Sequence, residues 1–341
     1  MEKSLLNVIK GKEVKRIPVW IMRQAGRYLP AYQKLRKKYD FLTLCQTPEL
    51  AAEVTLQPVE ILDVDAAILF SDILIPCLSL GFQVQFVEGK GPVVHNPVTS
   101  VEDIRNLNPD YSSRELESLS QTVKFINQQL PPEKALIGFT AAPFSLACYL
   151  IEGASSKNFL QVKSFLYDHT PSYRLLMEKV SEILFVYLKT QAEAGAEVLQ
   201  LFDTWGGILS PSDFEKYVFP FLNKLIREVK KEYSLPLIYF MKGSGGFLSI
   251  LKHLPVEVMS IDWTLDLERA SESLEDRFVL QGNLDPAVLL SRREIIREKT
   301  TEILQKGKKV KGHIFNLGHG ILPSTPVAHA RYLVETVHNF G

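Results

Sequence analysis

Two arginines stand four residues apart in a stretch that also contains glycine, Arg23-Gln24-Ala25-Gly26-Arg27. Arginine presents a planar fork of N–H donors that matches the two oxygens of a carboxylate or phosphate, and an unpaired guanidinium beside apolar chain is costly. The backbone N–H groups of the stretch add donors if the turn forms an anion-binding nest. These residues therefore indicate a substrate with carboxylate or phosphate groups. The structural alternative is a set of salt bridges to nearby acids.

Asp72 interrupts an otherwise apolar run, residues 66–76. A carboxylate in such a run is costly unless it accepts several N–H hydrogen bonds or holds a cation, so Asp72 is a candidate for binding or catalysis. The structural alternative is that Asp72 caps the N-terminus of a following helix.

Tyr149, Thr204 and His319 are further candidates: Thr204 and His319 follow predicted strands closely, and Tyr149 lies in the helix-like stretch 143–152 that follows the predicted strand 135–139. Each also has a structural alternative. Tyr149 fits a core position with its hydroxyl satisfied, Thr204 fits a helix cap, and His319 fits a tight turn in which backbone groups bond the ring. The sequence contains no Ser-His-Asp order, P-loop or paired-carboxylate motif, so these residues alone do not name a reaction.

Eight short apolar segments are placed to position these side chains, and helical patterns separate them. The segments are residues 18–21, 66–70, 135–139, 197–202, 235–240, 258–261, 278–280 and 313–316. Two of the helical patterns, 48–62 and 171–194, follow a threonine as expected N-cap and begin with proline.

This alternation, without a linker, predicts an α/β fold: a single (β/α)8 TIM barrel over residues 1–341, with its active site at the C-terminal ends of the strands. An alternating pattern near residues 81–95, around Glu88-Gly89-Lys90-Gly91, predicts a hairpin insertion. A doubly wound open sheet is the rival fold, but no strand is followed by G-x-G-x-x-G.

The composition bears on partners and location. Basic and acidic residues both number 39, so no net charge attracts nucleic acid. No leader pattern or apolar run of membrane-spanning length is present, and we expect a soluble, cytoplasmic protein without a membrane partner. The three cysteines form no C-x-x-C and the histidines show no zinc-ligand spacing, so we expect no metal.

The strand-end segments, taken together and in order from about residue 5 to residue 332, resemble the uroporphyrinogen decarboxylase family. The segments that carry the resemblance are 18–30, 68–74, 138–144, 149–153, 202–205, 281–286 and 315–321. The sequence departs from the family at two positions. Ala31 stands where glutamate is common, and Thr204 stands where serine is frequent but keeps the hydroxyl.

The resemblance implies a homodimeric enzyme of tetrapyrrole biosynthesis. Such an enzyme removes four CO2 from the acetate side chains of uroporphyrinogen III and forms coproporphyrinogen III without cofactor or metal. By matching motifs, Asp72 and Arg23 are the implied catalytic residues, with Asp72 accepting the pyrrole N–H groups. The implied substrate contacts are Arg23, Gln24, Ala25, Gly26, Arg27, Asp72, Tyr149, Thr204 and His319, and Arg36 matches another arginine of the family.

This chemistry suits the residues. Protonating a pyrrole carbon beside an acetate arm turns the ring into an electron sink, and a fixed carboxylate stabilises the positive charge. Arg23, His319 and a substrate-bound water are the alternatives for the proton donor. The alternative functions are a zinc-dependent corrinoid or folate methyltransferase of the same barrel superfamily and a non-catalytic tetrapyrrole-binding protein. The first needs late thiolate ligands, yet no cysteine follows Cys148.

Overall fold

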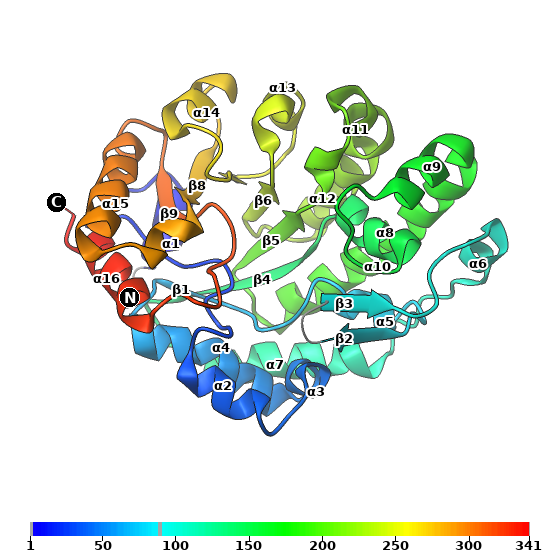
Figure 1. Ribbon diagram of the computed structural model, residues 1–341, viewed down its shortest axis with the longest axis horizontal. Helices are drawn as coiled ribbons and strands as arrows, with labels where there is room; N and C mark the ends of the chain where they lie inside the picture. The colour runs from blue at the N-terminus through cyan, green and yellow to red at the C-terminus, as the bar shows by residue number, and fades with distance from the viewer. Residues whose placement is uncertain (1–2, 88–90, 341) are drawn as a thin grey trace.

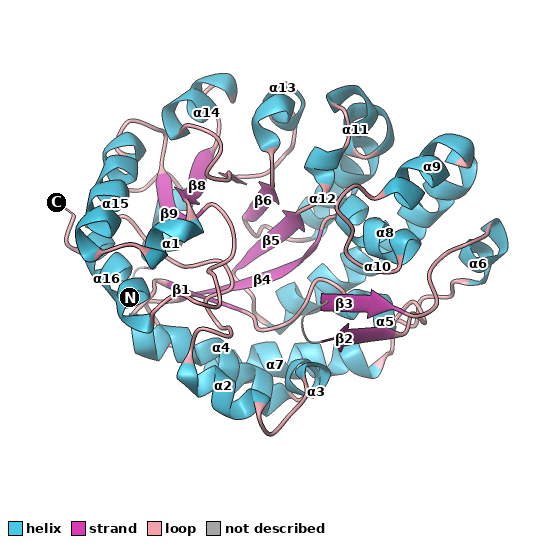
Figure 2. Cartoon of the chain, in the orientation of Figure 1, coloured by secondary structure: helices cyan, strands magenta, loops and turns pink. Residues whose placement is uncertain are grey.

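A curled sheet of parallel strands forms the centre of the computed structural model, which describes residues 3–87 and 91–340. Helices surround the strands (Figure 2). The sheet order is β1-β4-β5-β6-β7-β8-β9. The bounds are β1 Ala66–Ile68, β4 Ala135–Ala141, β5 Val198–Asp203, β6 Leu237–Met241, β7 Val258–Ser260, β8 Val279–Leu284 and β9 His313–Leu317. Seven of the eight predicted strands are thus confirmed, and the TIM-barrel class with them.

The eighth predicted strand, residues 18–21, occupies the gap between β9 and β1 but is not a regular strand. A single parallel bridge joins Val19 to Phe315, and the Asp65 N–H donates to the Val19 carbonyl at 2.7 Å. Side chains take N–H groups that a ladder would use: Val19 donates to the Asp65 carboxylate at 2.9 Å, and Ile21 to Gln24 Oε1 at 3.0 Å. The segment therefore closes the ring through side chains as much as through backbone pairing.

The principal outer helices pack against this ring (Figure 1). They are α4 Pro48–Leu62, α7 Arg114–Gln129, α10 Thr170–Ala194, α12 Phe219–Glu232, α14 Leu267–Ser273, α15 Arg293–Gly307 and α16 Val327–His338. Both predicted helices are confirmed. Their capping is not: Thr47 stands at the N-cap without a side-chain bond, and Thr170 is already helical and donates to the Leu166 carbonyl.

Shorter helices and a hairpin extend the loops between these units. The helices are α1 Ser4–Ile9, α2 Pro30–Arg36, α3 Phe41–Gln46, α5 Ile75–Leu78, α6 Val101–Asn106, α8 Pro143–Glu152, α9 Leu160–Asp168, α11 Pro211–Tyr217 and α13 Leu248–Leu251. The predicted hairpin is confirmed as antiparallel β2 Val84–Val87 and β3 Gly91–Val94, which lie beside α5 in Figure 1. Its predicted turn at Glu88–Lys90 lies outside the described residues. Across residues 3–87 and 91–340, no helix is both long and apolar enough to cross a bilayer.

Buried amides fill part of the barrel interior. Gln281 accepts a hydrogen bond from the Trp20 indole at 2.9 Å and donates to Ser260 at 3.0 Å and to Gln200 at 3.4 Å. All three partners are buried. These contacts make the interior a packed core, so a ligand has to bind at an end of the barrel.

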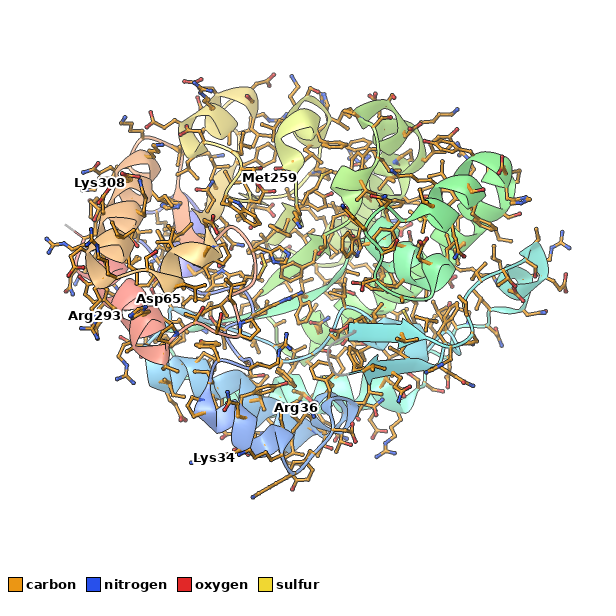
Figure 3. All side chains as sticks on the ribbon, in the orientation of Figure 1. Lys34, Arg36, Asp65, Met259, Arg293 and Lys308 are labelled. Carbon is orange, nitrogen blue, oxygen red and sulfur yellow. The ribbon has the colours of Figure 1, made fainter. Side chains whose placement is uncertain are left out.

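Asp65 anchors the opposite, N-terminal end of β1, where Figure 3 labels it beside α16. Its buried carboxylate accepts hydrogen bonds from Arg16 at 2.8 Å, from the Val19 N–H at 2.9 Å and from His338 at 3.0 Å. Burial alone would raise the pKa of Asp65, but the hydrogen bonds from His338 and Val19 and the charge of Arg16 hold it below its ordinary value.

We expect Asp65→Asn to lower the free energy of unfolding by about 3–5 kcal/mol at pH 7, because it unpairs a buried network. A carboxylate with a depressed folded-state pKa stabilises the fold above its unfolded pKa and loses that contribution as pH falls through the folded value. The difference between the two proteins should therefore shrink below about pH 4. Urea unfolding from pH 7 to pH 3 measures this. The control is Glu102→Gln at a carboxylate that is 68% exposed and lies near the exposed Arg105, and an equal loss there would contradict the assignment.

Candidate active site

The loop that follows residues 18–21 holds Arg23 in a strained backbone conformation. Arg23 has a φ of 62°, in the left-handed region that residues with side chains rarely adopt. The neighbours hold this geometry: the Met22 N–H donates to the Asn316 side chain at 2.8 Å, and the Ile321 N–H donates to the Met22 carbonyl at 2.9 Å. Such a conformation costs about 1–3 kcal/mol and is concentrated at functional sites. The surrounding hydrogen bonds therefore hold Arg23 in a conformation that it would not adopt on its own.

Gln24 has a structural role in the same loop. Its buried side chain accepts from the Ile21 N–H and donates to the Ala66 carbonyl, both at 3.0 Å, which ties the loop to β1. Both ends of the amide therefore serve the fold, so the predicted substrate contact of Gln24 falls to its backbone. Ala25 and Gly26 are half-buried in the turn, where a Cβ on Gly26 would lie 3.0 Å from the Arg23 carbonyl oxygen.

Arg23 lies directly against the turn that follows β9. A Cβ added to Gly320 would lie 2.3 Å from Arg23 Cδ and 2.9 Å from Cγ, so only glycine leaves room for this side chain. The charge of the exposed Arg23 lowers the pKa values of Asp72, Tyr149 and His319, in each case as a smaller effect than burial. The charge of Arg23 therefore acts on three other predicted residues, Asp72, Tyr149 and His319.

Asp72 follows β1 and is half-buried. Its Oδ1 accepts the Leu74 N–H at 2.9 Å, one turn ahead of the short helix α5. Within residues 3–87 and 91–340, Oδ2 has no recorded hydrogen-bond partner. Burial raises the pKa of Asp72, while the Leu74 N–H and the charge of Arg23 oppose that rise. The carboxylate thus makes a local turn contact with one oxygen and keeps the other available to a ligand.

Tyr149 and Thr204 come from neighbouring βα units. Tyr149, on α8, is buried and packs edge-on against Trp205, with ring centroids 6.2 Å apart; Thr204, the residue before Trp205, is half-buried. Burial, with a further contribution from the charge of Asp72, raises the pKa of Tyr149 to about 12. The hydroxyl is therefore protonated at neutral pH and able to donate a hydrogen bond.

Asp203 stabilises the loop that contains Thr204 and Trp205. The buried carboxylate accepts hydrogen bonds from Ser145 at 2.6 Å and from Tyr239 at 2.8 Å, and Ser145 in turn accepts the Trp205 N–H at 3.0 Å. Burial raises the pKa of Asp203 to about 6, although these hydrogen bonds oppose it. The geometry makes Asp203 a positioning residue for the loop that carries Thr204.

His319 is half-buried between the rings of Phe240 and Trp263, whose centroids lie 5.9 and 6.4 Å away. Burial lowers the pKa of His319 to about 4. The charges of Arg23 and Lys242 add to this effect, and Asp262 opposes it. His319 is therefore neutral at physiological pH.

We expect the NMR titration of His319 to have its midpoint near pH 4, well below the ordinary histidine value of about 6.5. His313, which is buried and also has a lowered pKa of about 4, requires the His319→Asn variant for assignment of the resonance. Since the folded-state pKa lies below the unfolded one, His319 destabilises the fold progressively as pH falls from about 6.5 to 4. A midpoint above pH 6 would contradict this environment.

Two further predicted arginines lie next to α2. The exposed Arg27 and Arg36 both lower the pKa of Tyr32, a buried residue of α2, and Arg36 donates to the Tyr39 carbonyl at 2.6 Å. Figure 3 labels Arg36 in the region of α2 and α3. Arg23, Asp72, Tyr149 and His319 therefore form one cluster, whereas Arg27 and Arg36 form a second group of cations beside it.

Sequence reasoning missed Lys242. Lys242 directly follows β6, which matches the predicted strand 235–240. Its position just after a predicted strand is the sequence signal that identifies it. The described residues contain no group of three His, Cys, Asp or Glu side chains able to hold a metal ion.

The whole sequence matches one protein family. Residues 1–340 match the family described as uroporphyrinogen decarboxylase (URO-D). The chain is 46% identical over 335 residues to the uroporphyrinogen decarboxylase of Syntrophotalea carbinolica, covering 98% of this chain and 97% of that protein. It is 45% identical over 341 residues to that of Geobacter sulfurreducens, covering 100% and 99%.

Solved structures share the architecture at much lower identity. A methyltransferase from Methanosarcina mazei superposes with a TM-score of 0.78 at 20% identity, covering 98% of this chain and 97% of its own. A B12-independent methionine synthase from Shewanella sp. W3-18-1 gives a TM-score of 0.59 at 10% identity, covering 95% and 94%. At these identities the likeness concerns the fold alone.

Proposed function

The chain belongs to the uroporphyrinogen decarboxylase family, and we propose that the cluster around Arg23 removes CO2 from the four acetate side chains of uroporphyrinogen III, giving coproporphyrinogen III. The chain is accordingly a carboxy-lyase. The observation that supports the assignment of the site is that Asp72, a desolvated carboxylate with an available oxygen, lies within the electrostatic influence of Arg23, an arginine with a left-handed backbone conformation.

Substrate binding follows from matching charges. Uroporphyrinogen carries eight carboxylates around a ring with four inward N–H donors, so its centre needs an acceptor and its edge needs cations. Asp72 supplies the acceptor through Oδ2, while Arg23 and, from the α2 side, Arg27 supply guanidinium groups. Tyr149 can donate its hydroxyl proton to a substrate oxygen, and Thr204 adds a second hydroxyl.

Each decarboxylation consumes one proton and releases one CO2. Protonation of the pyrrole carbon next to the one that bears the acetate arm places a positive charge on the ring, in conjugation with the acetate CH2 group. The C–C bond to the carboxylate then breaks, its electron pair neutralises the ring, and a second proton converts the exocyclic CH2 to methyl as the ring proton is lost. Asp72 stabilises the cationic ring, and a fixed charge in a desolvated site does this better than water.

The protonation state of His319 limits which group can act as the proton donor. A histidine with a pKa of about 4 carries no proton to donate as imidazolium at neutral pH. A water molecule bound with the substrate is the simplest donor, with Arg23 orienting the carboxylate, because a guanidinium is a very weak acid. His319 in this proposal acts as a neutral hydrogen-bonding group.

The decisive experiment is incubation with uroporphyrinogen III under anaerobic, reducing conditions, followed by chromatography of the oxidised products. We expect the eight-carboxylate substrate to disappear and a four-carboxylate product to accumulate. Unchanged substrate that nevertheless binds would overturn the proposal in favour of a tetrapyrrole-binding protein. Stoichiometric, tightly bound zinc would instead favour a methyltransferase.

We also propose a homodimer and a cytoplasmic location. Family membership supports the dimer, and sedimentation of a monomer at micromolar concentration would contradict it. The free, buried thiols of Cys45, Cys77 and Cys148 suit a reducing compartment.

A further inference from the structure

Lys242 stands at the end of β6 on the same side as a residue of the site. The Phe240 ring, two positions earlier, packs 5.9 Å from the His319 ring. Alternate residues of a strand place their side chains on the same face of the sheet. Lys242 therefore lies on the same face as Phe240, one step closer to the carboxyl end of the sheet. The effect of the Lys242 charge on His319 agrees with that placement.

Neighbouring loops hold the backbone of Lys242 in place. A Cβ on Gly207 would lie 2.4 Å from the Lys242 carbonyl oxygen, so the loop after β5 packs directly against this residue. Gly243 then turns the chain with a φ of 74°, and its N–H donates to the buried carboxylate of Asp262. Lys242 is thus an exposed side chain on a constrained backbone, unlike a lysine on a free helix surface.

The ammonium group of Lys242 has no acidic partner across the described ranges 3–87 and 91–340. The nearby acid, Asp262, already accepts hydrogen bonds from Gly243 and from the N–H of Thr264, the latter at 2.9 Å. Arg23 likewise has no ion pair in the same part of the chain. Two uncompensated cations therefore lie close to His319, and together they favour an anion there.

We propose that Lys242 binds a carboxylate of the tetrapyrrole substrate beside His319, at a position away from the reacting acetate. This inference rests on the proposed function. Asp72 follows β1 and Lys242 follows β6, and β4 and β5 lie between these two strands in the sheet, so Lys242 lies away from the residue that binds the ring centre. An ammonium is a point charge with freely rotating donors, and it suits a flexible propionate arm that stays unchanged through all four reactions.

The proposal predicts an effect on binding without an effect on chemistry. A contact made equally in the ground state and the transition state changes KM and leaves kcat unaltered. Lys242→Gln should raise KM for uroporphyrinogen about tenfold, in line with a hydrogen bond to a charged group, with kcat within about twofold. Lys242→Arg should restore most of the affinity because it keeps the charge. Added salt should raise the wild-type KM more than that of Lys242→Gln.

Lys224→Gln is the matched control, because Lys224 lies exposed on the outer helix α12 with Glu228 3.8 Å away. Its KM should equal that of the wild type. An unchanged KM in Lys242→Gln, with normal wild-type turnover, would overturn the role of Lys242 and leave the proposed function standing. Absence of turnover in the wild type would instead overturn the proposed function. The NMR midpoint of His319 should rise in Lys242→Gln, and an unmoved midpoint would show that the two groups are not neighbours.

Discussion

Asp72→Asn is expected to lower kcat for total decarboxylation at least about a hundred-fold while the protein remains folded. Asparagine keeps an oxygen for the Leu74 N–H, so the turn before α5 should survive. The substitution removes the negative charge that stabilises the cationic ring, and it can present an amide donor to pyrrole N–H groups that need an acceptor. Steady-state kcat, with thermal unfolding measured beside it, tests this expectation.

Asp285→Asn is the control for Asp72→Asn. Asp285 also follows a strand, and it also accepts a hydrogen bond from an N–H two residues ahead, that of Ala287 at 2.9 Å. Its substitution should change activity by no more than a few-fold. Near-normal turnover in a stable Asp72→Asn protein would reduce Asp72 to a turn residue.

The pH dependence of kcat/KM tests whether the negative charge of Asp72, and not only the shape of its side chain, is needed for activity. Because burial raises the pKa of Asp72, the acid limb of kcat/KM in the free enzyme should lie above the ordinary aspartate value of about 3.9. Protonation removes the acceptor, so activity should fall as pH decreases through that limb. The limb should be absent from the residual activity of Asp72→Asn.

The strands could be predicted from sequence because both faces of a parallel sheet are buried. Continuous apolar runs such as 135–139 and 313–316 therefore stand out, and both coincide with strands to within a few residues. Residues 18–21 look the same in sequence. Their pairing is reduced to one bridge because Asp65 and Gln24, one distant and one local, take their N–H groups. Such competition depends on tertiary neighbours and leaves no periodic signal.

The expectation that functional residues lie just after the barrel strands also located the cluster at Arg23, Asp72 and His319, because side chains after parallel strands converge at one end of a barrel. It could not separate residues that face a ligand from residues that hold the loops. Gln24 sits among the candidates by position, yet its amide is consumed by the Ile21 and Ala66 backbone. Hydrogen-bond partners of this kind are visible only once the segments are placed in space.

Arg23→Ala and Gly320→Ala are expected to lower kcat/KM through the same interaction. Removing the guanidinium should cost about a hundred- to a thousand-fold, the usual loss when one preorganised electrostatic contact to the reacting substrate is removed. Gly320→Ala places a methyl group 2.3 Å from the present position of Arg23 Cδ, which is too close for a contact, and so displaces the guanidinium. A misplacement of about 1 Å can cost a hundred-fold, and we expect a loss of about ten- to a hundred-fold.

The double variant decides whether Gly320 acts through Arg23. In the Arg23→Ala background the methyl of Gly320→Ala meets neither Cγ nor Cδ, so the second substitution should cost less than about threefold in kcat/KM. This non-additivity is the signature of a shared contact. Full additivity would mean that Gly320 influences the site through the β9 backbone or His319 instead. Thermal unfolding should change little in either single variant, because Arg23 is exposed and its backbone strain is already present in the native protein. The expected pattern is a large loss of activity with stability retained, and it would tie the glycine after His319 to the placement of the arginine.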